Sequence, residues 1–173
     1  MTLIARMADT TDPWEIPTIF RVKPNGVAAY VDGEFAWPEG QLRLFPRHIG
    51  ITVTGIPAMA QHARVIDVER FDATPADVPP FLENRAKLGH PDGEVYCDRS
   101  TVAEVLAAIE GRQPEPWWWI ATLDNHPWTP GELAADIRDN YGADIAPQRI
   151  RAIQCYPGGH FDTSLCYGQT WAR

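Results

Sequence analysis

The chain has 173 residues, which predicts about one domain and is short for a complete eightfold barrel of roughly 250 residues. Its formal net charge of −8 argues against a broad basic surface of the kind that binds nucleic acid or anionic lipid. We therefore expect neither nucleic acid nor a membrane among its partners. Apolar residues make up 45% of the chain, an ordinary share for a globular protein, which argues against wholesale disorder.

The cysteines and the N-terminus indicate neither a disulfide framework nor a targeting segment. Cys97, Cys155 and Cys166 have no C-x-x-C spacing, and an odd number leaves one unpaired in any disulfide scheme. They are typical of small core residues. The N-terminus lacks a charged start followed by a long apolar run, and no stretch approaches 18 apolar residues. We expect no signal peptide and no transmembrane segment, and a protein synthesised in the cytoplasm.

The chain divides into an N-terminal segment and a region rich in short β-like runs. Residues 1–25 contain three prolines and no sustained period, which predicts an irregular arm before a single domain over 26–173. Most of the runs that follow are apolar on both faces, as parallel strands covered by helices are. The predicted strands are 26–32, 48–54, 63–69, 94–98, 117–123 and 149–156.

Helix signals separate the later strands. A capping box of Thr101 and Glu104 opens an apolar pattern that ends at Gly111, and Thr129 opens a second helix. A weaker third helix is expected over about 80–88. This alternation of strand and helix predicts an α/β fold.

One connection is too short for the usual crossover helix. The stretch 55–63 separates two predicted strands by only a few residues. We therefore predict a degenerate, shortened (β/α) TIM-type barrel with mostly parallel strands.

Three consecutive tryptophans begin one predicted strand. Trp117 and Trp119 share one face of it, and Trp118 lies on the other. Core packing is favoured for Trp118, whereas core and site remain equal alternatives for Trp119.

In such a fold the functional site lies outside the carboxyl ends of the strands. Polar residues follow five of the predicted strands at that end. They are Asp32, the pair Asp67 and Glu69, Asp98, Asp124 with Asn125, and the segment from Tyr156 to Asp162.

The pair Asp67 and Glu69 is the strongest candidate for a catalytic site. Positions two apart on a strand point to the same side, with their Cα atoms roughly 6–7 Å apart. The carboxyl oxygens can then approach the about 5–5.5 Å separation that retaining glycosidases use, or open toward the inverting range. Mutual repulsion and partial burial separate an acid from an anionic partner. The pair therefore predicts acid and base chemistry on a glycosidic bond.

The D-x-E pattern by itself is weak, because it also occurs at Asp32 to Glu34 and at Asp92 to Glu94. The Asp92 pair lies in a turn before a strand, at the wrong end, and is typical of solvated turn chemistry. A structural role for Asp67 and Glu69, binding loop amides or an arginine, remains an alternative. So does a magnesium or calcium site, if the four acidic residues Asp32, Asp67, Glu69 and Asp162 converge.

The order of these motifs resembles a known family. Five features follow one another: VD ending at Asp32, DVE with Asp67 and Glu69, EVYCDRS with Tyr96, WWWIATLDN with Trp119, and AIQCYPGGHFDTS with Gln154, Tyr156 and Asp162. Residues 26–168 thus resemble the family 25 glycoside hydrolase barrel, a lysozyme-type muramidase. They more closely resemble the abbreviated glycoside-hydrolase-like domains of actinobacteria and their phages.

The resemblance implies roles for individual residues. Glu69 would be the general acid, Asp67 the anion that stabilises the oxocarbenium-like state or assists the substrate's N-acetyl group, and Asp32 and Asp162 supporting carboxylates. Aromatic rings would contact the apolar faces of the sugars. The residues assigned to substrate binding are Tyr30, Tyr96, Trp119, Asp124, Gln154 and Tyr156. No cofactor and no resident metal are expected.

We therefore predict a muramidase-type hydrolase of peptidoglycan, the bacterial cell-wall glycan. Such a protein reaches the wall by holin release or as part of a phage particle. The chain departs from the family in its length, its missing crossover helix, and the Gly33-Glu34 that follows Asp32. The alternative is a non-catalytic glycan-binding or virion structural module with phage virion or tail proteins as partners. A metal-dependent hydrolase is the third hypothesis.

Overall fold

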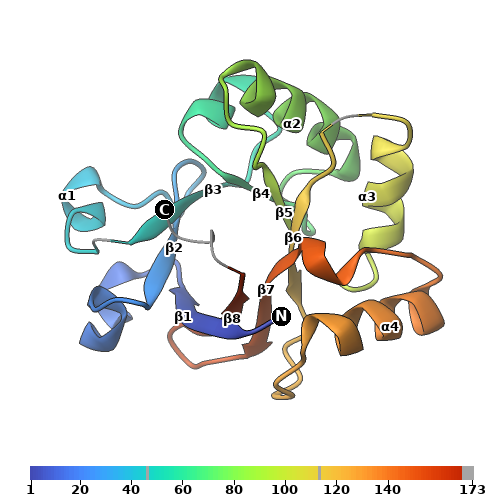
Figure 1. Cartoon of the computed structure of the whole chain (residues 1–173). Coiled ribbons are helices and arrows are strands. Elements are labelled where there is room, and N and C mark those ends of the chain that lie inside the picture. The colour runs from blue at the N-terminus through green and yellow to red at the C-terminus, as the bar shows by residue number, and fades with distance from the viewer. Residues whose placement is uncertain (46, 113, 169–173) are drawn as a thin grey trace.

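A computed structural model describes residues 1–45, 47–112 and 114–168 of the chain. Eight strands form a closed barrel in which each strand pairs with its neighbours in sequence order, and the eighth returns to the first. Figure 1 views this ring of strands with α2, α3 and α4 around one side of it and α1 on the other. The strands are β1 (Leu3–Asp9), β2 (Gly26–Tyr30), β3 (His48–Thr52), β4 (Val65–Asp67), β5 (Glu94–Asp98), β6 (Trp117–Ala121), β7 (Ile150–Tyr156) and β8 (Asp162–Tyr167).

The connections between strands contain few and short helices. The α-helices are α1 (Glu39–Leu42), α2 (Val78–Lys87), α3 (Val102–Ile109) and α4 (Pro130–Tyr141), and 3₁₀ turns occupy Pro13–Glu15, Thr18–Arg21, Pro57–Gln61, Pro75–Asp77 and Pro147–Arg149. The stretch 55–63 indeed holds only a 3₁₀ turn. The three helices predicted from the sequence correspond to α2, α3 and α4.

The strand pairing is mixed. Neighbouring strands from β1 to β7 run parallel, whereas β8 runs antiparallel to both β7 and β1. The barrel predicted from the sequence is thus confirmed, as a closed mixed barrel with few helices. The expected regular alternation of strand and helix fails on the β8 side, where a short loop after β7 turns the chain straight back.

The prediction of an irregular arm over residues 1–25 is wrong for Leu3–Asp9. This segment is β1, and it pairs in register with both β2 and β8. Met7 and Ala8 are fully buried, one inside the barrel and the other outside it. The sequence analysis missed β1 because Arg6 interrupts its apolar residues, and it missed β8 because polar residues begin that strand.

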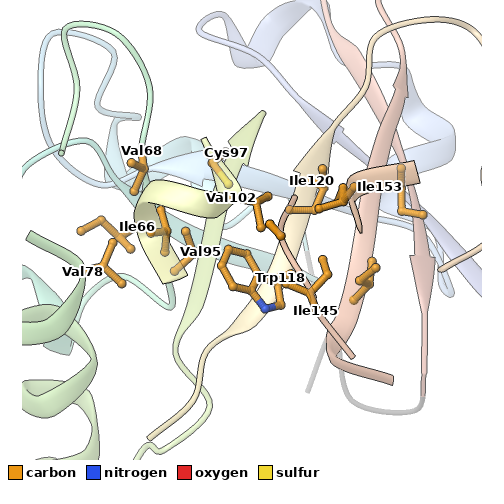
Figure 2. Packing of buried hydrophobic residues seen from close by; sticks show 14 of the residues in the cluster. Ile66, Val68, Val78, Val95, Cys97, Val102, Trp118, Ile120, Ile145 and Ile153 are labelled. Atoms are coloured by element: carbon orange, nitrogen blue, oxygen red, sulfur yellow. The ribbon is translucent and has the colours of Figure 1, made fainter. Parts of the chain in front are cut away.

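Two apolar layers form on either side of the strands, because successive side chains alternate between the two faces. Inward-facing residues such as Met7, Val65 and Trp119 fill the barrel interior. Outward-facing residues such as Ile66 and Trp118 pack against α2, α3 and α4, and Figure 2 shows Trp118 among them. The core prediction for Trp118 is confirmed. The three cysteines are free and buried, also as predicted.

The helix ends follow the predicted chemistry in one case and not in another. Thr129 and Glu132 form the capping box of α4, with Gly142 in the left-handed conformation at its end. The capping box predicted for Thr101 and Glu104 is wrong. The carboxylate of Asp98 instead accepts hydrogen bonds from the backbone N–H groups of Ser100 and Thr101. No helix within the described ranges is long and apolar enough to cross a membrane.

The position of β1 in the barrel can be tested with two residues of the same strand. Met7 lies in the interior, so Met7→Ala is expected to lower the free energy of unfolding by about 2–5 kcal/mol. Ile4 is 37% exposed, and Ile4→Ala should change it by less than about 1 kcal/mol. Urea denaturation measures both values. Equal, small effects would show that residues 1–25 are a dispensable arm.

Candidate functional site

Three carboxyl groups meet at the carboxyl end of β4. Asp67 ends the strand with 1% of its surface exposed, and Glu69 follows two positions later with an exposed side chain. One oxygen of each lies within 4.8 Å of the other and of an oxygen of Asp72. The pair predicted from the sequence is therefore brought together at the mouth of the barrel, with Asp72 as an additional member.

A tight turn brings Asp72 to this cluster. The backbone N–H of Asp72 donates to the carbonyl oxygen of Glu69 at 3.1 Å, and Phe71 between them has a φ of 79°. This left-handed conformation is uncommon for a bulky residue and is typical of the third position of a type II turn. The Phe71 ring is 89% exposed. Sequence reasoning missed Asp72 because no turn residue such as glycine marks this reversal.

A second acidic residue faces the same end of the barrel from β1. Asp9 is the last residue of β1, and its Oδ1 accepts a hydrogen bond of 2.8 Å from the Gln154 side chain on β7. Gln154 accepts in turn a hydrogen bond of 2.6 Å from the Tyr96 hydroxyl on β5. Asp9 was missed because its strand was not recognised. Its place at the end of an apolar run, like that of Asp67, is the signal that could have found it.

Burial and crowding favour the protonated forms of these carboxyl groups. Burial, followed by the charges of Glu69, Asp72 and Asp9, raises the pKa of Asp67 to about 9. Burial and the charge of Asp162 raise the pKa of Asp9 to about 7, although the hydrogen bond from Gln154 opposes this.

Glu69 follows the same trend. Desolvation raises its pKa, while the Tyr96 hydroxyl opposes the rise. The sequence predicts one raised and one ordinary pKa in the Asp67 and Glu69 pair, whereas both are raised. The cluster therefore keeps at least one proton near neutral pH.

Asp32, predicted to be catalytic, is held by a different set of contacts. Its carboxylate accepts hydrogen bonds of 2.6 Å from the hydroxyls of Thr52 and Thr54 and one of 2.9 Å from the backbone N–H of Val53. These bonds join the chain after β2 to the end of β3, which is a structural role. Its charge still acts on Asp72, whose pKa it helps to raise after desolvation.

Asp162 and Tyr30 border the site. They line a small open pocket of about 240 Å³ together with Asp9. Asp162 begins β8 and accepts a hydrogen bond of 2.8 Å from the backbone N–H of Gly158, and its charge raises the pKa of both Asp9 and Glu69. These two predicted site residues thus lie beside the carboxyl cluster.

The other predicted substrate-binding residues are less accessible or lie elsewhere. Trp119 is fully buried in the barrel interior, where its Nε1 donates to Ser164 and its ring contacts Tyr96, so it offers no surface to a sugar. The inward face of β6 packs against other side chains of the barrel interior, so the predicted contact of Trp119 with a sugar has no exposed surface. Tyr96 and Gln154 are also buried. Gln154 donates to Asp9, and the Tyr96 hydroxyl interacts with Glu69. Tyr156 packs against the outer core cluster.

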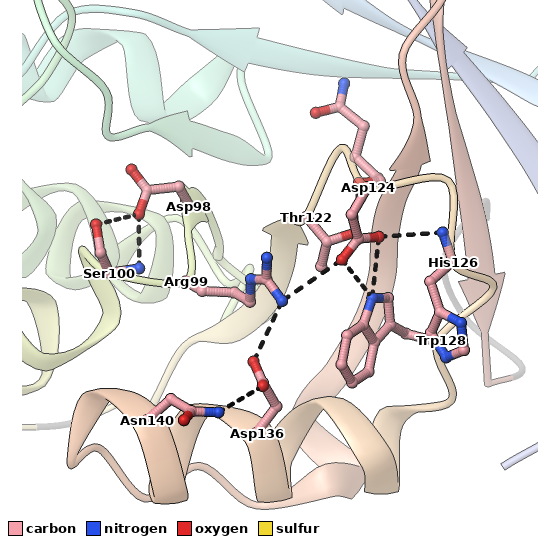
Figure 3. A network of polar contacts seen from close by, with 10 residues as sticks. Asp98, Arg99, Ser100, Thr122, Asp124, His126, Trp128, Asp136 and Asn140 are labelled. Atoms are coloured by element: carbon pink, nitrogen blue, oxygen red, sulfur yellow. Dashed lines mark hydrogen bonds and ion pairs between the residues drawn. The ribbon is translucent and has the colours of Figure 1, made fainter.

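Asp124 belongs to a separate network on the rim. It accepts hydrogen bonds from the backbone N–H of His126 and from Nε1 of Trp128, and it pairs with Arg99 at 3.5 Å. Arg99 also pairs with Asp136 on α4 at 3.3 Å, as Figure 3 shows. The network ties the loop after β6 to the loop after β5 and to α4, which accounts for Asp124 without a ligand.

The D-x-E pattern that was set aside lies at the opposite end of the barrel. Glu94 begins β5 and is buried against Arg64 at 3.3 Å and Arg151 at 3.8 Å. Asp92 pairs with Arg85 at 2.8 Å. The arginine partners mark this pair as structural, but the prediction of solvated turn chemistry is wrong for Glu94, which is 2% exposed.

Comparisons with known proteins support the fold alone. No family model matches the chain, and no curated protein matches it. The crystal structure of an uncharacterized protein of B. stearothermophilus is similar over 94% of this chain and 96% of that one, with a TM-score of 0.59 and 11% sequence identity. The similarity extends over nearly the whole chain, and at this identity it concerns architecture only.

The raised pKa of Asp9 predicts a pH dependence of stability. The folded state keeps the Asp9 proton up to about pH 7, whereas the unfolded chain releases it near pH 4. The free energy of unfolding should therefore fall as pH rises from about 4 to 7, by at most about 1.4 kcal/mol per pH unit for this one proton. Asp9→Asn keeps an oxygen that can accept from Gln154 and should reduce this slope by the share of that one proton, while Asp67, whose pKa is also raised, keeps its own share.

Urea denaturation at several pH values in chelator-containing buffer measures the slope. The exposed Asp144 provides the matched control Asp144→Asn, which should keep the wild-type slope. A wild-type slope in Asp9→Asn would show that Asp9 is already ionised in the folded protein.

Proposed function

We propose that the chain is a shortened (β/α) barrel of TIM type that hydrolyses bacterial cell-wall glycan by acid and base catalysis. One observation carries the proposal: Asp67 and Glu69 present carboxyl oxygens at most 4.8 Å apart at the carboxyl end of a barrel strand. This is the end at which barrel enzymes hold their active sites. The choice of peptidoglycan as the glycan rests on the family resemblance of the motifs.

The spacing of the carboxyl groups restricts the reaction. Inverting glycosidases separate their two carboxyl groups by about 6.5–9.5 Å to leave room for a water molecule, whereas retaining ones use about 5–5.5 Å. One oxygen of Asp67 lies within 4.8 Å of one of Glu69, which is compatible with the closer, retaining arrangement. Asp67 is 1% exposed and poorly placed to attack a sugar carbon, which favours assistance by the substrate's own N-acetyl group.

The two carboxyl groups have different access to a substrate. Glu69 is exposed and can reach a glycosidic oxygen, so the proton that the pair retains is delivered through Glu69 as the bond to the sugar carbon breaks. The pair then carries both negative charges at the moment when positive charge develops on the sugar ring. The buried Asp67 anion stabilises that charge. Water finally adds to the sugar carbon and returns a proton to the pair.

The mouth also offers aromatic surface. Phe71 is held 89% exposed in the turn that joins Glu69 to Asp72, and Tyr30 lines the pocket beside Asp9. Aromatic rings suit the apolar faces of pyranoses. In the proposed site these two rings take the sugar-binding part that the sequence analysis assigned to Trp119.

Release of reducing ends from purified peptidoglycan tests the proposal. Glu69→Gln keeps the shape of the side chain but cannot deliver the proton, and we expect a loss of about 10²–10⁴-fold in rate with little change in melting temperature. The matched control is Glu104→Gln, because Glu104 is exposed on α3 outside the barrel. Wild-type protein that releases no reducing ends would overturn the hydrolase proposal.

A non-catalytic glycan-binding module is the second candidate, and the near-complete burial of Asp67 favours it. In that case the wild-type protein sediments with cell walls but releases nothing, and Phe71→Ala reduces sedimentation. A module of this kind also fits a place in a phage particle, with virion or tail proteins as partners. Sedimentation and release measured on the same samples separate the two candidates.

A further inference from the structure

We propose that Asp67, Glu69 and Asp72 form a binding site for a divalent cation that prefers oxygen ligands, with Ca²⁺ as the ion of best fit. All three side chains present an oxygen to one common space at the mouth of the barrel. Asp67 comes from the end of β4, and Glu69 and Asp72 come from the turn that follows. Sequence reasoning considered Asp32 and Asp162 as partners of this pair, but Asp32 is bound to Thr52 and Thr54 instead.

The state of Asp67 points to a ligand. Its side chain is 1% exposed, and no described residue donates a hydrogen bond to its Oδ1. Buried polar atoms are nearly always paired, and a buried carboxylate without a partner is costly. At the other end of the barrel Oε2 of the buried Glu94 also lacks a hydrogen bond, but two arginines within 3.8 Å balance its charge. A cation at the three carboxyl groups would provide for Asp67 what the arginines provide for Glu94.

The carboxylate ligands and their spacing are compatible with Ca²⁺. Ca²⁺ binds oxygen at about 2.3–2.6 Å, so ligands on opposite sides of it lie about 4.6–5.2 Å apart. Mg²⁺ binds at about 2.0–2.1 Å, which brings opposite ligands to about 4.2 Å or less. The three oxygens lie within 4.8 Å of one another, close enough to share one ion of this kind. Mg²⁺ demands near-ideal octahedral geometry and gives up its water molecules reluctantly, which favours Ca²⁺ at a site of three carboxylates.

The surroundings suit a weak, solvent-accessible site. Glu69 is exposed and Asp72 is partly exposed, so water can complete the six to eight ligands of Ca²⁺. We expect a dissociation constant of about 10⁻⁴–10⁻³ M, at the weak end of the range of Ca²⁺ sites in proteins. The turn between Glu69 and Asp72 holds two of the ligands in place through its 3.1 Å backbone hydrogen bond.

This inference does not rest on the proposed hydrolysis, because cation binding is measured without a glycan. The two functions nevertheless interact at Glu69. A bound cation keeps Glu69 ionised, so it cannot at the same time deliver a proton. If the chain is a hydrolase, Ca²⁺ acts as its inhibitor and not as its cofactor.

Isothermal titration of the chelator-stripped protein with CaCl₂, and separately with MgCl₂, tests the site. We expect one Ca²⁺ per chain, weaker binding of Mg²⁺, and at least a tenfold rise in the Ca²⁺ dissociation constant in both Asp67→Asn and Asp72→Asn. Asp144→Asn removes the same charge from an exposed position elsewhere and should bind Ca²⁺ as the wild type does. Circular dichroism establishes that each variant is folded.

Three results would overturn the inference. The first is the absence of saturable Ca²⁺ binding up to about 10 mM, which is tenfold above the weakest expected dissociation constant. The second is wild-type Ca²⁺ affinity in Asp72→Asn. The third is a loss of Ca²⁺ affinity in Asp144→Asn equal to that in Asp72→Asn. Tighter binding of Mg²⁺ than of Ca²⁺ would overturn the choice of ion. Because no glycan is present, a failure here leaves the hydrolysis proposal standing, and a failure of hydrolysis leaves the cation site standing.

Discussion

Closure of the barrel is the constraint on which the candidate site depends. β8 runs antiparallel between β7 and β1, so every strand has two neighbours and the inward side chains face one another across a narrow interior. A polar side chain on that face finds its partners only across the barrel or at an open end. Gln154 on β7 therefore reaches Asp9 on β1, and Tyr96 on β5 reaches Gln154. Hydrogen bonds from β5 and β7 thus hold Asp9 of β1 in place.

Buried acidic residues have different partners at the two ends of the barrel interior. At the amino end of the strands, Glu94 lies against Arg64 and Arg151, and Arg151 also lies 3.7 Å from the centre of the Trp117 ring. At the carboxyl end, Asp67 and Asp9 have mainly other carboxyl groups and neutral side chains around them. The first arrangement is a structural network in which arginines balance the charge of the buried acid. The second lacks such positive side chains, and a proton or a bound cation would stabilise it.

In the two proposals made above, a proton and a cation compete for the same three oxygens, and each would lead to a different chemistry. With a proton, the exposed Glu69 can act as an acid toward a bound sugar. With a cation, the same group becomes a ligand. The turn from Glu69 to Asp72 supports both states, because it holds Asp72 close to the pair and projects Phe71 outward.

The sequence by itself determined the local parts of this picture. Six of the strands, the helices α2, α3 and α4, and the shared orientation of Asp67 and Glu69 follow from side-chain period, capping and apolar runs, which act over a few residues. Only the tertiary structure decided that Leu3–Asp9 and Asp162–Tyr167 are strands, since each is stabilised by pairing with partners distant in sequence. It likewise decided that Asp9 and Asp72 join the cluster while Asp32 and Trp119 do not. Whether a side chain reaches the mouth depends on barrel closure and on one left-handed turn, and neither leaves a periodic trace in the sequence.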